Sequence, residues 1–157
     1  MDNTNIDWEK ITQFSTPEDS IGYLFWQTTR LWQQRVSEIL EDLEINHTQF
    51  VMLVGVAWLT RDDCLVTQVR LAEFCRIDVM LTSQMVRKLE KKNLIQRKSH
   101  PSDTRAKILF LTIHGKDILK EALKLVSKLD RKFFGHCNQR LLKSELLELY
   151  SSVQREQ

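Results

Sequence analysis

The sequence predicts a mainly α-helical fold that contains one small β wing. The chain has 157 residues with only 4 Gly and 2 Pro, so long helices joined by few turns are expected. Apolar residues recur at helical spacing along most of the chain, and 42% of all residues are hydrophobic, which is enough to form a core. The length fits a single domain over residues 1–157.

The first long helix is expected to run from Thr16 to about Leu43. Thr16 is a suitable N-cap, and Pro17 fits the first helical position. The acidic residues Glu18 and Asp19 follow, where the positive end of the helix dipole favours them. The apolar positions at helical spacing are Ile21, Leu24, Phe25, Trp32, Val36, Ile39, Leu40 and Leu43.

Two shorter helices are expected next. Thr48 opens a helix over 49–59 that is apolar almost all round and should therefore be buried. Thr67 can cap a helix over 68–75, and residues 76–81 form the turn that follows it. The apolar positions of this second helix are Val69, Leu71, Ala72 and Phe74.

The next helix, over 83–93, carries its positive charge on one face. Thr82 is the expected N-cap, and Asn93 stands where a left-handed C-cap residue is expected. At about 100° per residue, Met85, Val86 and Leu89 form one apolar sector. The opposite sector holds Ser83, Gln84, Arg87, Lys88 and Lys91. These polar groups suit a DNA major groove, although a solvated basic helix face is the alternative.

A basic hairpin follows this helix. Residues 94–98 and 106–112 are expected to be strands, and 99–103 has the composition of a turn. The segment 82–107 holds eight Lys and Arg against two acidic residues, whereas residues 1–60 hold three basic and nine acidic residues. Helix, turn, helix and hairpin in this order predict a winged helix-turn-helix region over 61–115, which suits a polyanion such as nucleic acid.

Long helices flank this region on both sides. Thr112 opens a helix that reaches about Phe134, and another helix is expected over 141–153 after Gly135. Their apolar stripes, and that of the first helix, are too long to be covered by the winged helix alone. We therefore expect a helical dimerisation region over 16–45 and 116–157, with a monomer whose helices fold back as the alternative.

Several short motifs occur in a fixed order within residues 71–115. They are Leu71-Ala72, Thr82-Ser83-Gln84, Leu89-Glu90-Lys91-Lys92, Leu94-Ile95-Gln96-Arg97, Pro101-x-Asp103-x-Arg105 and Leu111-Thr112-x-x-Gly115. Together they resemble the central segment of the MarR family of bacterial winged-helix transcription regulators. One departure is Asn93, where the family pattern usually has Gly, and Asn can adopt the same backbone conformation.

The resemblance implies a transcription regulator that binds double-stranded DNA as a homodimer. In the family the first, fifth and sixth helices intertwine across a two-fold axis, so a roughly palindromic operator is expected. Repression is the usual mode of the family. An RNA-binding winged helix and a protein-interaction adaptor are the alternative functions.

The chemistry of the residues assigns the expected DNA contacts. The residues expected to reach base edges are Ser83, Gln84 and Arg87. The residues expected to hold phosphates are Thr67, Gln68, Lys88 and Lys91. The residues expected to line the wing are Arg97, Lys98, Ser99 and His100. The family resemblance implies that Arg105 enters the minor groove and that Asp103 orients it.

A second candidate site is a crevice for a small aromatic ligand. Many family members bind such compounds between the dimer helices and the winged helix. The residues that could line the crevice here are Trp26, Arg30, His47 and Trp58. The alternative is that the aromatic residues are ordinary core residues.

Catalytic and metal chemistry are not expected. The four His lie apart in sequence, and Cys64, Cys75 and Cys137 make no CxxC pair. These cysteines are expected to be reduced, because the chain shows neither a signal peptide nor an apolar run long enough for a membrane span. Cys75 is expected to be a buried packing residue, with redox sensing as the alternative. We expect a cytoplasmic protein that needs no cofactor and no membrane.

Overall fold

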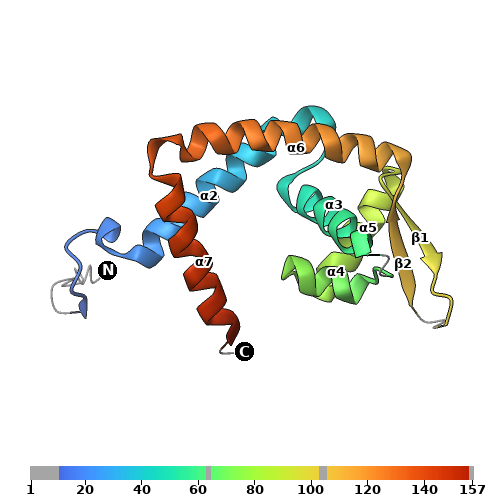
Figure 1. Ribbon diagram of the computed structural model, residues 1–157, viewed down its shortest axis with the longest axis horizontal. Helices are drawn as coiled ribbons and strands as arrows, with labels where there is room; N and C mark the ends of the chain where they lie inside the picture. Colours follow the sequence, from blue (N-terminus) through green and yellow to red (C-terminus); the bar gives the residue numbers. More distant parts are fainter. Residues whose placement is uncertain (1–10, 63–64, 103–105, 156–157) are drawn as a thin grey trace, which may run out of the picture.

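The computed structural model describes residues 11–62, 65–102 and 106–155 (Figure 1). The elements, in chain order, are η1 (Pro17–Asp19), α2 (Ile21–Ile39), η2 (Glu41–Leu43), α3 (His47–Leu59), η3 (Thr60–Asp62), α4 (Gln68–Cys75), α5 (Val79–Lys91), β1 (Ile95–Ser99), β2 (Lys107–Leu111), α6 (Ile113–Phe133), η4 (Phe134–His136) and α7 (Gln139–Arg155). The mainly helical fold with a small β wing is thus confirmed.

Helix α6 connects the two ends of the molecule (Figure 1). At one end lie α3, α4, α5 and the hairpin of β1 and β2, which together form the winged helix-turn-helix. Helix α2 packs against α6, and α7 turns back from the far end of α6 (Figure 1). The long helices therefore extend well beyond the winged helix.

One hydrophobic core joins α2, the winged helix and α6. Its buried apolar residues are Val36, Leu40, Ile45, Phe50, Met52, Leu53, Val56, Val66, Leu71, Val86, Leu89, Leu94, Ile95, Leu109, Leu119, Ala122 and Val126. Helix α3 contributes most of its length to this core, as its uniformly apolar sequence predicts. By contrast, α7 buries none of its residues.

The second helix of the helix-turn-helix begins earlier than expected. Asp78, and not Thr82, is its N-cap, because the Asp78 Oδ1 accepts hydrogen bonds from the backbone N–H groups of Met80 and Leu81 at 2.8 and 3.1 Å. Thr82 is fully buried within the helix. The turn after α4 is therefore shorter than predicted, and Arg76 makes it possible with a left-handed φ of 51°.

Two further helix starts differ from the prediction. The N-cap of α3 is Asn46, not Thr48, because its Oδ1 accepts from the Gln49 N–H at 2.9 Å while the Gln49 Oε1 accepts from the Asn46 N–H. The first helix is also interrupted: a 3-10 turn precedes Ser20, which caps α2, and a second 3-10 turn follows Leu40. The caps at Thr67 and Thr112 are confirmed.

The base of the wing is joined to α6 at Leu94. Asn93 has a left-handed φ of 55°, as predicted for a C-cap position. The Leu94 carbonyl oxygen then accepts from the Thr112 backbone N–H at 3.1 Å. Gly115 follows in the first turn of α6, where an added Cβ would lie 2.0 Å from the same oxygen. Only glycine allows this close approach of helix and backbone.

We predict that Gly115→Ala lowers the free energy of unfolding by about 2 kcal/mol or more, because the backbone of Leu94 must move to admit the methyl group. Gly135→Ala is the matched control, since nothing lies within 4 Å of a Cβ built at Gly135. Urea unfolding of the two variants measures the difference. Equal stabilities would contradict the close packing at Leu94.

Candidate nucleic-acid interface

Helix α5 has one buried face and one exposed polar face, as the sequence predicts. Val86 and Leu89 are fully buried, together with Thr82. Ser83 is half-buried at the edge. The exposed side chains on the other face are Gln84, Arg87, Lys88 and Lys91. Amide and guanidinium groups on an exposed helix face are the groups that read base edges in a major groove.

Helix α3 packs closely against α4, the first helix of the helix-turn-helix. A Cβ added to Gly55 would lie 2.7 Å from the Leu71 Cδ1 and 3.1 Å from the Cys75 Sγ, so the two helices touch at the glycine. Burial raises the pKa of the Cys75 thiol to about 11. This cysteine therefore stays protonated and acts as a packing residue.

The wing is an antiparallel hairpin held against α5. Ile95 pairs with Leu111 at its base, and Ser99 pairs with Lys107 near its tip. The Arg97 Nε donates to the Glu90 Oε2 at 2.8 Å, which ties β1 to α5. The guanidinium of Arg97 is therefore paired with a carboxylate of the protein itself. The spacing of the two residues in the sequence did not indicate this contact.

Other wing residues also have contacts within the hairpin. The Lys98 Nζ lies 5.4 Å from the centre of the Phe110 ring, a cation–π arrangement. The Ser99 Oγ accepts from the Lys107 Nζ at 3.0 Å, and the His100 Nδ1 accepts from the Ser102 N–H at 3.3 Å. Asp103 and Arg105, expected at the wing tip, lie outside the described residues.

The two residues expected at the entry to α4 lie next to the wing. Thr67 caps α4 through its Oγ1, which accepts from the Arg70 N–H at 3.3 Å, and it also pairs with Ile108 of β2. Gln68 is the first residue of the helix. Arg70 is an exposed cation in this first turn that sequence reasoning missed. The sequence could have indicated Arg70, because it lies three residues after the predicted N-cap Thr67 and therefore in the first turn of α4.

The C-terminal end of α5 faces an acidic turn. Lys88, Lys91 and Lys92 line a depression of about 600 Å³ together with Glu41 and Glu44. The Lys92 Nζ also donates to the Glu44 carbonyl oxygen. Lys88 and Lys91 are exposed, so they can reach a phosphate, but carboxylates compete for them at this end.

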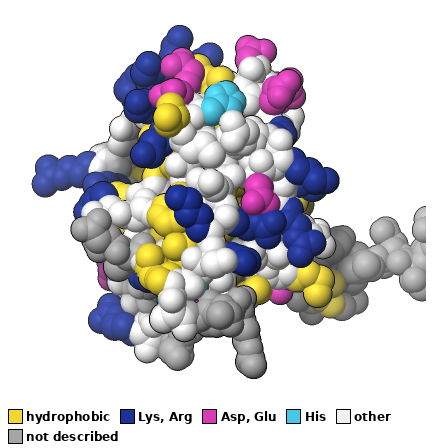
Figure 2. Space-filling model, turned by 90° about the vertical axis from the view of Figure 1, so that its right-hand side faces the viewer, with side chains coloured by type: hydrophobic (Ala, Val, Ile, Leu, Met, Phe, Trp, Pro, Cys, Tyr) yellow, Lys and Arg dark blue, Asp and Glu magenta, His cyan; other side chains and the backbone are white. Residues whose placement is uncertain are grey.

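Basic side chains are spread over the wing end of the molecule, which Figure 2 shows face-on with apolar and polar patches between them. The exposed cations of α4 and α5, of the C-caps of these helices and of the described part of the wing are Arg70, Arg76, Arg87, Lys88, Lys91, Lys92, Lys98 and Lys107. Within these elements the exposed acids are fewer, so the surface suits a polyanion.

Three of the four residues expected in a ligand crevice line one cavity. Trp26, Arg30 and His47 border a cavity of about 730 Å³ between α2 and the start of α3. Trp58 does not join them. It lies at the other end of α3, where its ring packs 4.3 Å from the Arg61 guanidinium.

His47 connects this cavity to the core. Its ring packs edge-on against Trp32 at a centroid distance of 5.2 Å, and the Trp32 Nε1 donates to the Asp130 Oδ1 at 2.9 Å. The His47 Nε2 is buried and has no hydrogen-bond partner among the described residues. Burial lowers the pKa of this imidazole below its ordinary value.

Comparison with known proteins identifies the family. A model of the MarR family matches residues 45–107. YdcH of Bacillus subtilis strain 168, an uncharacterized HTH-type transcriptional regulator, is 38% identical over 130 residues, or 83% of this chain and 87% of YdcH. This chain belongs to the MarR family. It is therefore a DNA-binding transcription regulator of the winged-helix type and not an enzyme.

Solved structures share the fold of this MarR-family regulator. The S. aureus MepR–DNA complex superposes with a TM-score of 0.76 at 24% identity, covering 85% of this chain and 98% of MepR. CouR from Rhodococcus jostii RHA1 bound to p-coumaroyl-CoA gives a TM-score of 0.77 at 21% identity, covering 88% and 94% of the two chains.

Within residues 11–62, 65–102 and 106–155, no three His, Cys, Asp or Glu side chains lie close enough to hold a metal ion. None of the helices in these ranges combines the length and the apolar character that a membrane span needs.

The position of His47 predicts a pH-dependent stability of this MarR-family regulator. Because the folded pKa is lowered, the unfolded chain binds a proton more readily. The free energy of unfolding is thus unaffected above the ordinary His pKa of about 6.5 and falls as pH drops below it. Thermal unfolding between about pH 7.5 and 5.5 should show this loss in the wild type and less of it in His47→Gln. Equal slopes would exclude a contribution from His47.

Proposed function

We propose that this MarR-family regulator is a repressor that binds a pseudo-palindromic operator as a homodimer. The observation that carries the proposal is the exposed polar face of α5, whose opposite face is fixed in the core. Gln84 and Arg87 are at the middle of this face, and Arg87 can donate two hydrogen bonds to a guanine. Ser83 is the third residue proposed to reach base edges.

Phosphate contacts would set the position of the reading helix. Thr67, Gln68, Lys88 and Lys91 are proposed for this role, because helix entries and flexible cations hold phosphates without reading sequence. Lys98, Ser99 and His100 would follow the backbone from the wing. Asp103 and Arg105 retain their proposed minor-groove role on the family resemblance alone.

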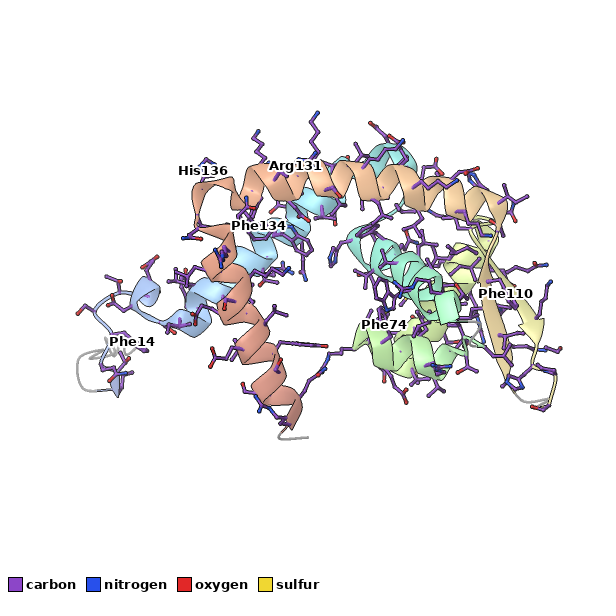
Figure 3. All side chains as sticks on the ribbon, viewed as in Figure 1. Phe14, Phe74, Phe110, Arg131, Phe134 and His136 are labelled. Carbon is purple, nitrogen blue, oxygen red and sulfur yellow. The ribbon has the colours of Figure 1, made fainter. Side chains whose placement is uncertain are left out.

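The homodimer is proposed from the uncovered apolar surface of the long helices. A groove of about 770 Å³ lies between α7, the end of α6 and Phe25 of α2. Figure 3 shows Phe134 at the corner where α6 meets α7, and this residue lines the groove. Leu147 and Tyr150 line it too, and about half of each side chain is exposed. A second copy would cover this surface by two-fold symmetry and place two reading helices on successive turns of DNA.

Release from DNA is proposed to follow the binding of a small aromatic acid. The cavity beside Trp26 offers a ring for stacking, and Arg30 offers a partner for an acidic group. The cavity borders both α2 and α3, so a ligand there would act where the dimer helices meet the winged helix. CouR, which shares the fold, was solved with an aromatic thioester bound.

We predict that Arg87→Ala weakens operator binding by about 1–3 kcal/mol and relaxes discrimination at one base pair. The operator is first obtained by selecting bound fragments from genomic DNA. Arg140→Ala is the control, because it removes the same charge from an exposed position on α7. Titration against operator and random duplexes measures the effect. An equal loss on both duplexes would show that Arg87 reads no base, and binding to RNA alone would favour the RNA-binding alternative.

We predict that Leu147→Glu converts the protein to monomers, because a carboxylate would be buried in the proposed interface. Ser151→Glu introduces the same charge on α7 outside the groove and should leave the dimer intact. Sedimentation equilibrium distinguishes the two outcomes. A monomeric wild-type protein at micromolar concentration would contradict the homodimer.

A further inference from the structure

Helix α6 carries a regular series of lysines on its outer face. The series, called here the lysine ridge, consists of Lys116, Lys120, Lys124, Lys128 and Lys132, all exposed. At about 100° per residue, successive members are offset by about 40°, so the ridge winds around α6, and its three central members, Lys120, Lys124 and Lys128, lie opposite the buried Leu119, Ala122 and Val126. Figure 1 shows α6 along the edge of the molecule that lies opposite α4, so the ridge begins beside the wing base at Lys116 and then leads away from the helix-turn-helix.

The fold itself does not require this series. Like charges four residues apart destabilise a helix, and the ridge repeats that spacing along its whole length. Two ridge members form exposed ion pairs within the helix, Lys120 with Asp117 at 3.3 Å and Lys124 with Glu121 at 3.1 Å. Such pairs offset part of the repulsion and contribute little else.

The rest of the ridge remains available. In the part of the chain that the structure describes, Lys116, Lys128 and Lys132 have no ion pair or hydrogen bond from their side chains. The ridge thus stays net positive after its two ion pairs are counted. This local excess of positive charge stands in a chain whose total is only +2.

The dimensions of the ridge match a row of phosphates. Successive members are about 6 Å apart along the helix axis, and the whole ridge spans about 24 Å. One DNA strand presents a charge about every 3.4 Å, and the three central lysines span about 12 Å of the helix axis, so they can meet a short run of phosphates. No aromatic residue occurs between residues 113 and 132. Because protein interfaces rely on Trp, Tyr and Arg, this surface fits DNA better than a folded protein partner.

We propose that the lysine ridge is a second DNA-binding surface, which holds the phosphate backbone of a neighbouring duplex while α5 engages the operator. The contact would be independent of base sequence, since lysine side chains at this spacing meet phosphates and not base edges. In a homodimer the two ridges would lie on the side away from the operator, so one molecule could hold two DNA segments together.

The test uses the full-length protein saturated with an immobilised operator duplex. A fluorescent duplex of about 30 base pairs that lacks the operator is added at low salt, and its retention is measured. The charge-neutral variant replaces Lys116, Lys120, Lys124 and Lys128 by Gln. The matched control replaces the same four by Arg, which keeps the charge. Lys132 is left unchanged because its neighbour Arg131 lines the α7 groove.

Retention of the second duplex should fall about tenfold or more in the Gln variant and persist in the Arg variant, and its salt slope should fall by about 3 to 4. Operator affinity and circular dichroism should be the same in all three proteins. The proposal is overturned if the wild type retains no second duplex, or if the Gln variant retains as much of it as the wild type does. It is also overturned if polyglutamate binds to the ridge and the second duplex does not compete with it. Should no operator exist, the proposed function fails alone, because the Gln and Arg variants can still be compared on random duplex.

Discussion

The junction at the Leu94 carbonyl oxygen fixes the position of the winged helix relative to the long helices. Helix α5 ends in the left-handed turn at Asn93, and the carbonyl of Leu94 accepts from the Thr112 backbone N–H. The Thr112 Oγ1 accepts in turn from the Gly115 N–H at 2.9 Å and so starts α6. Because Gly115 has no Cβ, helix and strand meet at van der Waals distance. The end of α5, the base of both strands and the first turn of α6 are thus joined at one point.

Local patterns made much of this fold predictable from sequence. The two faces of α5 follow from residue spacing alone, and Asn93 is one of the few residues that tolerate its conformation. The helix starts were less predictable, because several residues near each start could cap it. Thr82 has the right chemistry for a cap, but the core buries it, and Asp78 takes the role from a position that pattern alone did not favour. Which candidate caps a helix is decided by tertiary packing.

The site was predictable as a set of side chains but not as a set of contacts. The cations of α5 and the wing were evident in the sequence, whereas the pairing of Arg97 with Glu90 depends on how the strand lies against the helix. The residues predicted for the ligand cavity show the same difference between a correct set of side chains and their actual contacts. Trp26, Arg30 and His47 come together because α2 and the start of α3 are neighbours, while Trp58 is three helical turns away along α3. The roles of Asp103 and Arg105 stay predictions.

The ion pair between Arg97 and Glu90 has a mechanical consequence. It joins the middle of β1 to α5, so a tilt of α5 about the shared base at Leu94 would carry the hairpin with it. Five strand residues at about 3.3 Å each give a lever arm of about 16 Å. A tilt of about 10° at the base would then displace the wing tip by about 3 Å, roughly the length of a hydrogen bond. A slight rotation inside the protein is thereby magnified at the farthest point of the hairpin.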